Sequence, residues 1–152
     1  MVSRAQLDPD TSLTVRRTYP AARERVFRAW TDPAALRAWS CPLGFTVAEV
    51  QVDLRVGGIY RVAMQPPDKS EPSVAFGTYR EISPPERLVY TWQWEGGEMG
   101  ETLVTVEFRD LGGETEVVLV HELFPAADVR DLHNEGWVSC LEHLAQALPS
   151  IA

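Results

Sequence analysis

The sequence predicts an α+β domain in which a curved antiparallel sheet of about seven strands covers one long C-terminal helix. Three observations lead to this fold. Residues 13–19 alternate between two faces with a period of two, which is typical of a strand. Six further segments after residue 44 resemble strands separated by turn residues. The last segment has apolar residues at three- and four-residue steps, the spacing of an amphipathic helix.

A polar lead-in precedes a single domain. Residues 1–11 contain Asp8-Pro9-Asp10, so we expect them to form a loose, flexible segment. The domain is expected to span residues 12–149, because no repeat, low-complexity stretch or shift in composition marks a second unit. A chain of 152 residues is long enough to bury a core of its own.

Two short helices are expected after the first strand. Pro20 ends that strand and suits the first turn of a helix. The apolar positions of residues 21–30 then have helical spacing. Asp32-Pro33 is typical of an N-cap followed by a proline at the first helical position, so a second helix is expected from residue 33 to about Trp39.

Six strands are expected to follow as a meander. Short links between them favour antiparallel pairing, because parallel strands need long crossover connections. The links are rich in glycine and proline, as in Gly57-Gly58 and Pro84-Pro85. The expected strands span residues 45–54, 58–65, 73–82, 87–94, 101–109 and 115–123.

The clearest helix lies near the C-terminus. Asp128 or Asp131 is expected to serve its N-terminus, and Pro149 is expected to end it. A long amphipathic helix needs a broad apolar surface, which the concave face of the sheet supplies. Its apolar positions are Leu132, Gly136, Trp137, Cys140, Leu141, Leu144 and Leu148.

Composition excludes several classes of function. The net charge is −8, with 22 acidic and 14 basic residues, which opposes binding to nucleic acid or to an anionic membrane surface. No apolar run approaches the ~20 residues of a membrane-spanning helix. The N-terminus also lacks the pattern of a signal peptide, so we expect a cytoplasmic protein without membrane insertion.

Signatures of cofactors and metal ions are missing from the sequence. No glycine-rich phosphate-binding spacing occurs, and the three histidines have no HxxxH spacing. We therefore expect neither a cofactor nor a metal ion. His143 is expected to face solvent, because it falls among the polar residues of the last helix. Cys41 and Cys140 have no CxxC spacing and are expected to be reduced thiols.

Six stretches in a fixed order carry a family resemblance: VFRAWTDP (26–33), DLRVGGIY (53–60), GTYREI (77–82), PERLVYTW (85–92), TLVTVEF (102–108) and HNEGW (133–137). They resemble bacterial proteins of the activator of heat-shock-protein-90 ATPase homologue family. This family belongs to the START-like (SRPBCC, birch-pollen-allergen-like) superfamily, which has the helix-grip fold. One departure concerns the two adjacent tryptophans that relatives often carry after the second helix, since Trp39 here precedes Ser40-Cys41.

The resemblance implies a ligand cavity between the sheet and the long helix. From alternation alone, the bulky inward side chains favour a dry core over a ligand cavity, and the resemblance reverses that preference. With the resemblance, we expect a small, largely apolar ligand of aromatic or lipid-like character. The expected contact residues are Tyr60, Val62, Met64, Tyr79, Tyr90, Trp92, Val106, Leu119, His121, His133, Trp137 and Leu141.

Two other functions stay open as alternatives. The family name suggests a cochaperone-like interaction with a heat-shock protein 90 homologue. A hydrolase or cyclase would instead need His121 or His133 within hydrogen-bond reach of a carboxylate or of Cys41. Because the spacing places no carboxylate beside either histidine, no catalytic residue is assigned and a non-enzymatic protein is expected.

The outward face of the last strand carries two valines. Val118 and Val120 lie opposite the inward set and would be exposed if that face met water. One interpretation is ordinary β propensity. The other is a contact between two copies of the chain, so a homodimer remains an alternative.

Overall fold

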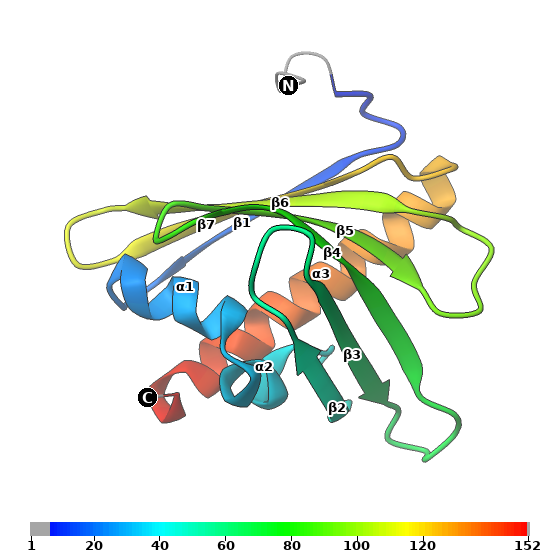
Figure 1. The fold of residues 1–152 in the computed structure, drawn as a ribbon, viewed down its shortest axis with the longest axis horizontal. Helices are drawn as coiled ribbons and strands as arrows, with labels where there is room; N and C mark the ends of the chain where they lie inside the picture. Colours follow the sequence, from blue (N-terminus) through cyan, green and yellow to red (C-terminus); the bar gives the residue numbers. More distant parts are fainter. Residues whose placement is uncertain (1–6, 152) are drawn as a thin grey trace.

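An antiparallel sheet wraps around one long helix in the computed structural model, which describes residues 7–151 (Figure 1). The elements follow the predicted order. They are β1 (Leu13–Tyr19), α1 (Arg23–Thr31), α2 (Pro33–Trp39), β2 (Thr46–Val52), β3 (Ile59–Gln65), β4 (Ser73–Ser83), β5 (Arg87–Trp94), β6 (Thr102–Asp110), β7 (Thr115–Glu122), α3 (Ala127–Ala147) and a final 3₁₀ turn (Leu148–Ser150). The predicted fold class is therefore confirmed.

Strands β2 to β7 form a meander, and β1 adds to its β7 edge. The strand order is β1-β7-β6-β5-β4-β3-β2, and every neighbouring pair is antiparallel. Because β1 pairs with β7, the first and last strands of the sequence are neighbours in the sheet. Register shifts at Val47/Glu49 and Tyr79/Glu81 mark irregularities on β2 and β4. Such bulges increase the local twist and bend of a strand.

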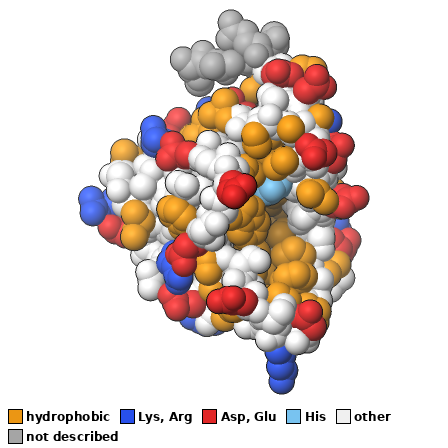
Figure 2. Space-filling view, turned by 90° about the vertical axis from the view of Figure 1, so that its right-hand side faces the viewer, with side chains coloured by type: hydrophobic (Ala, Val, Ile, Leu, Met, Phe, Trp, Pro, Cys, Tyr) orange, Lys and Arg blue, Asp and Glu red, His pale blue; other side chains and the backbone are white. Residues whose placement is uncertain are grey.

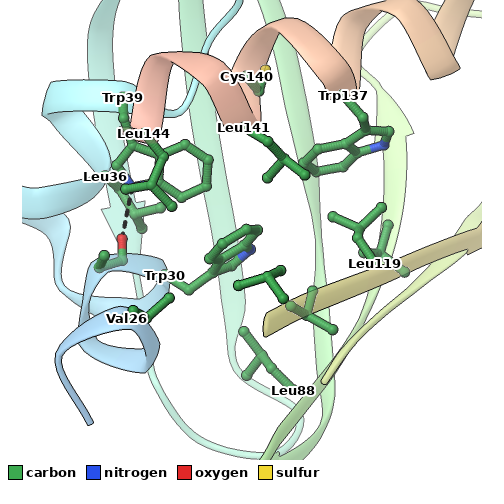
Figure 3. Packing of buried hydrophobic residues seen from close by; sticks show 14 of the residues in the cluster. Val26, Trp30, Leu36, Trp39, Leu88, Leu119, Trp137, Cys140, Leu141 and Leu144 are labelled. Atoms are coloured by element: carbon green, nitrogen blue, oxygen red, sulfur yellow. Dashed lines mark hydrogen bonds between the residues drawn. The ribbon is translucent and has the colours of Figure 1, made fainter. Parts of the chain in front are cut away.

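The two short helices form as their sequence signals predict. The Asp32 side chain accepts a hydrogen bond of 3.0 Å from the Ala34 backbone N–H, and Pro33 is the first residue of α2. The Trp39 indole Nε1 donates to the Ala29 carbonyl at 2.8 Å, which fastens α2 to α1 (Figure 3). Helix α1 begins at Arg23 rather than at residue 21, because Ala22 still has extended backbone.

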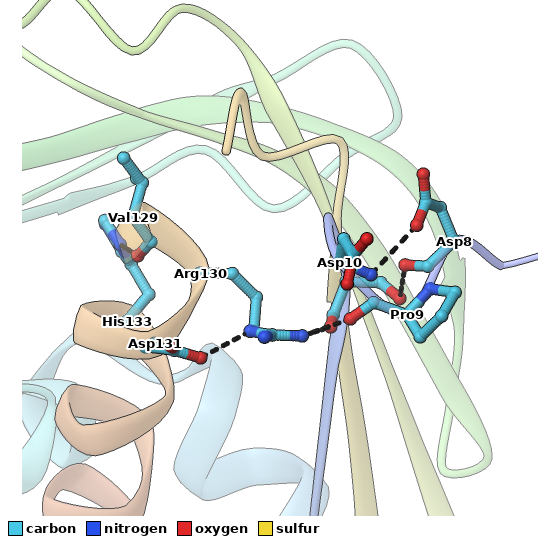
Figure 4. Close-up of polar contacts among 8 residues, drawn as sticks. Asp8, Pro9, Asp10, Val129, Arg130, Asp131 and His133 are labelled. Atoms are coloured by element: carbon cyan, nitrogen blue, oxygen red, sulfur yellow. Dashed lines mark hydrogen bonds and ion pairs between the residues drawn. The ribbon is translucent and has the colours of Figure 1, made fainter. Parts of the chain in front are cut away.

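The N-terminus of α3 is tied to the lead-in. Arg130 donates to the carbonyl groups of Pro9 and Ser12 and pairs with the carboxylate of Asp131 (Figure 4). The Thr11 N–H donates to the Asp8 carbonyl at 3.2 Å. Residues 8–11 thus form a turn held against α3, and the flexibility expected of this segment stays a prediction. Residues 1–6 of that expected segment lie outside the described residues.

The core fills the space between the sheet and the three helices. Leu88 and Leu119 from the strands meet Leu141 and Leu144 from α3, and all four are at most 1% exposed (Figure 3). Burying one such side chain contributes roughly 1.5–3 kcal/mol to stability. Trp30 adds an edge-to-face contact to Trp39, with 4.6 Å between ring centroids. The alternation of the strands correctly predicted these inward positions.

Two expectations about β7 are wrong. The strand was expected to include residue 123, but β7 ends at Glu122, and Leu123, with a φ of 73°, is 61% exposed. Val118 and Val120 are 0% and 4% exposed, although they point outward. Val118 lies between Arg16 on β1 and Glu107 on β6. Long neighbouring side chains cover such a valine with their aliphatic stems. Because Val118 is buried within one copy of the chain, it gives no support to a dimer.

Among residues 7–151, no helix is both long enough and apolar enough to cross a membrane.

Candidate ligand-binding site

The concave side of the sheet encloses a small apolar cavity. Its volume is about 50 Å³, well below the roughly 300–1,000 Å³ of sites for drug-sized ligands. Strands β3, β4 and β5 supply one wall, and the three helices supply the other. The lining residues are Trp30, Leu36, Trp39, Ser40, Tyr60, Val62, Met64, Tyr79, Leu88, Tyr90, Trp92, Trp137 and Cys140.

A larger groove adjoins this cavity and opens to solvent. Its volume is about 230 Å³, and Met64, Trp92, Trp137 and Cys140 belong to the walls of both spaces. Figure 2 shows a hollow on this side of the molecule, with hydrophobic side chains inside it and acidic side chains around it. The other lining residues of the groove are Pro42, Trp94, Leu132, His133 and Gly136. Cavity and groove together form the candidate site.

Three tyrosines make the inner wall. The ring centroid of Tyr60 lies 5.1 Å from that of Tyr90 and 5.8 Å from that of Tyr79. The Tyr60 hydroxyl donates to the Thr91 carbonyl at 2.7 Å, and the Tyr90 hydroxyl oxygen accepts from Trp30 Nε1 at 3.3 Å. Burial raises the pKa of all three phenols, that of Tyr79 to about 12, so the wall is uncharged at neutral pH.

Trp92 stands where cavity and groove meet. Its ring centroid is 5.2 Å from that of Trp137 and 5.6 Å from that of Trp94. These three indoles come from β5 and α3, so the site lies between the sheet and the long helix. The Trp137 Nε1 donates to His121 and the Trp94 Nε1 donates to His133. The Trp92 Nε1 is buried and has no hydrogen-bond partner among residues 7–151.

His121 belongs to a closed hydrogen-bond chain behind the site. Trp137 Nε1 donates to His121 Nδ1 at 2.9 Å, which leaves the proton of the neutral ring on Nε2. The His121 Nε2–H then donates to the Thr102 hydroxyl at 2.6 Å, because that hydroxyl donates to the Trp92 carbonyl. Both ring nitrogens of His121 and the Thr102 hydroxyl therefore have hydrogen-bond partners. Burial, with a smaller effect from nearby His133, lowers the pKa of His121 well below its usual range.

The burial of neutral His121 predicts a loss of stability in mild acid. Unfolded histidine has a pKa near ~6.5, so below this pH the unfolded chain binds a proton that folded His121 does not. The free energy of unfolding is therefore expected to fall by up to ~1.4 kcal/mol per pH unit as the pH decreases below ~6.5. Urea unfolding of the wild type and His121→Gln between about pH 5 and pH 7 measures this. Parallel curves for the two proteins would contradict it.

His133 is also fully engaged. Its Nδ1 donates to the Val129 carbonyl at 2.8 Å, since a carbonyl can only accept (Figure 4). Its Nε2 accepts from Trp94 Nε1 at 2.8 Å. In the described part of the chain, neither His121 nor His133 bonds to a carboxylate or to Cys41. The condition for histidine catalysis in the cavity is therefore not met.

Cys41 lies beside a histidine that the sequence did not pair with it. The His143 Nδ1 donates to the Cys41 carbonyl at 2.8 Å and lies 3.9 Å from its Sγ. His143 is thus half-buried rather than solvent-facing. Burial raises the pKa of the Cys41 thiol to about 11. A protonated Nδ1 is not a base for this thiol, so the pair offers no activated nucleophile.

The structure gathers most of the predicted contact residues at the candidate site. Tyr60, Val62, Met64, Tyr79, Tyr90, Trp92 and Trp137 line the cavity, and His133 lines the groove. Four predicted residues line neither space, because they are packed behind the first layer of side chains: Val106, Leu119, His121 and Leu141. Whether the lining residues contact a ligand remains a prediction.

Sequence reasoning missed the part of the site that α1 and α2 supply. Trp30, Leu36 and Trp39 were not among the expected contact residues, since helical spacing does not distinguish a packed position from one beside a gap. Gly136, in the interior of helix α3, also lines the groove. A lone glycine within a helical pattern is a signal that could have found it, because it often marks a packing or functional constraint.

Comparisons with known proteins extend these observations. The family model described as "Activator of Hsp90 ATPase homolog 1-like protein" matches residues 20–149. No curated protein matches the chain significantly.

Three solved structures show how closely the fold is shared. Protein CV1439 of Chromobacterium violaceum is 29% identical, with a TM-score of 0.83 and coverage of 91% of this chain and 96% of that chain. The AHSA1 protein (SPO3351) of Silicibacter pomeroyi is 26% identical, with a TM-score of 0.81 and coverage of 91% and 97%. A protein of Rhodobacter sphaeroides is 26% identical, with a TM-score of 0.79 and coverage of 97% and 99%.

Proposed function

Because the chain belongs to the family of Activator of Hsp90 ATPase homolog 1-like proteins, with a START-like fold, we propose that it binds a small, uncharged, largely apolar ligand between the sheet and α3. One observation carries the proposal: an apolar cavity and an apolar groove share four wall residues, and among residues 7–151 no Asp, Glu, Lys or Arg lines either space. The groove of about 230 Å³ accepts most of the ligand. The cavity of about 50 Å³ accepts a small part of it.

The lining explains why the ligand is uncharged. A charged group that leaves water for an apolar site loses its hydration, which is costly unless an opposite charge pairs with it. The lining provides aromatic faces, hydroxyl groups and N–H groups, which orient a neutral molecule. The acidic side chains around the hollow add repulsion against anions (Figure 2).

Binding without chemical transformation fits the polar groups of the site. The ring nitrogens of His121 and His133 are occupied by hydrogen bonds. The thiols of Cys41 and Cys140 are both buried, and burial raises the pKa of each. The described residues of the site therefore offer neither an available general base nor an activated nucleophile.

A pair of ring compounds of the same shape tests the proposal. Acetophenone is uncharged, and benzoate is a similar flat molecule that carries a negative charge. Acetophenone is expected to shift the indole resonances of Trp92, Trp94 and Trp137 in a protein-observed NMR titration, and benzoate is expected to leave them in place. Equal shifts with both compounds, or no shift with acetophenone, would contradict the proposal.

The family description favours a second candidate, an interaction with an Hsp90 homologue. Leu54, Val56 and Ile59 are exposed apolar residues around the β2–β3 turn, and they line neither the cavity nor the groove. A contact there would be independent of ligand binding. The ATPase rate of a purified Hsp90 homologue with and without this protein separates the two candidates.

A further inference from the structure

The indole N–H of Trp92 is a polar group without a use in the fold. Trp92 is 8% exposed, and its Nε1 has no hydrogen-bond partner among residues 7–151. Most buried donors in native proteins are satisfied, so an unsatisfied one needs an explanation. Trp92 is also a wall residue of both the cavity and the groove.

The other indoles nearby show that this fold does satisfy its tryptophans. Trp30 donates to the Tyr90 hydroxyl, Trp94 to His133 and Trp137 to His121. Each of these N–H groups has an acceptor on a different element of the fold, so each bond also holds the architecture together. Trp92 is the exception, at the junction of cavity and groove.

The Tyr90 hydroxyl adds a second donor in the same cavity. Its oxygen accepts from Trp30, and its own proton has no acceptor among the described residues. The Trp92 N–H and the Tyr90 O–H are thus two donors without an acceptor, and an oxygen acceptor on a ligand can match each of them. Charge is excluded by the absence of a pairing residue in the lining.

We infer that the ligand is a neutral apolar molecule bearing a carbonyl, ether or hydroxyl oxygen that accepts a hydrogen bond from Trp92 Nε1. This inference rests on the proposed function and specifies its ligand class. The apolar part of the ligand lies in the groove against Trp94 and Trp137, and the oxygen lies at the junction with the cavity. The Tyr90 hydroxyl is placed to donate to a second oxygen or to water.

Acetophenone and α-methylstyrene test this ligand class. They have nearly the same shape, and the carbonyl oxygen of one is a CH₂ group in the other. Trp92→Phe keeps an aromatic ring and removes the N–H. We expect this substitution to weaken acetophenone about tenfold more than α-methylstyrene, because it costs only the ketone a hydrogen bond. The difference in hydration between the two ligands cancels when both are measured on both proteins.

Trp94→Phe is the matched control. It removes a second indole of the same groove whose N–H already has an acceptor in His133. Both ligands are expected to lose affinity together on this variant, so the ratio of their dissociation constants stays as in the wild type. A ratio that changes equally in Trp92→Phe and Trp94→Phe would overturn the inference.

A measurement on the wild type keeps the inference testable even if Trp92→Phe fails to fold. The protein has five tryptophans, so its indole N–H resonances can be followed one by one. Acetophenone is expected to move the Trp92 indole proton downfield, as a new hydrogen bond does, and α-methylstyrene is not. Equal responses to both ligands would overturn the acceptor inference but support the binding site. No response to either ligand would count against the proposed function itself.

Discussion

Gly136→Phe is expected to close the groove and weaken acetophenone binding by roughly 10- to 150-fold, the equivalent of the ~1.5–3 kcal/mol gained by burying one aromatic ring. Gly136 lines the groove, and a Cβ added there meets no atom within 4 Å. The new side chain therefore starts in open space at the groove, and its ring is expected to occupy the place of the ligand. Glycine is also the poorer helix former, so stability is expected to be kept or raised.

The control for this prediction introduces the same side chain two residues away. Val138 lies on α3, is 50% exposed and lines neither the cavity nor the groove. Val138→Phe is expected to bind acetophenone as the wild type does. NMR titrations of the three proteins, with urea unfolding of each, make the comparison. Unchanged affinity in Gly136→Phe would mean that the ligand does not use the groove.

Gly77→Ala is expected to lower the free energy of unfolding by at least about 3 kcal/mol, near the upper end of overpacking effects. A Cβ at Gly77 would lie 2.0 Å from the Thr91 carbonyl oxygen and 2.6 Å from its carbonyl carbon. These are backbone atoms of the neighbouring strand β5, so β4 and β5 would have to move apart. The same carbonyl accepts the hydrogen bond of Tyr60, which places Gly77 directly behind the inner wall of the site.

Gly136→Ala is the matched comparison for stability. It makes the same chemical change at a glycine with open space, within a helix, where alanine is favoured over glycine by roughly 0.5–1 kcal/mol. The two substitutions are therefore expected to have opposite signs. Urea unfolding followed by tryptophan fluorescence measures both. Similar stabilities of Gly77→Ala and the wild type would show that the close approach of β5 does not constrain β4.

Alternation and turn chemistry were enough to predict the sheet. Strand β5 begins and ends at the predicted residues 87–94, and α2 spans the predicted 33–39. What sequence reasoning could not predict depends on tertiary position. The outward Val118 is buried because β7 lies between β1 and β6. The alternation of residues along a strand does not predict which strands are its neighbours in the sheet. Leu123 leaves the strand through a positive φ that its residue type does not announce.

The site was predictable on the sheet side and in part on α3, which supplies the predicted Trp137 and His133, but not on α1 and α2. Tyr60, Tyr90 and Trp92 share the inward face of their strands, so alternation found them. A cavity, however, is the volume that remains after all side chains have packed, and periodicity contains no information on that remainder. The same limit explains why Leu119 and His121 were expected as contacts, although the first layer of side chains covers them.

Intermolecular NOEs between unlabelled acetophenone and the isotope-labelled wild-type protein test the central claim most directly. The claim is that the space between the sheet and α3 binds a neutral apolar ligand beside Trp92. It predicts NOEs from the ligand to the indole protons of Trp92, Trp94 and Trp137, and their loss in Gly136→Phe. NOEs only to exposed residues such as Val56, or none at all, would contradict the claim.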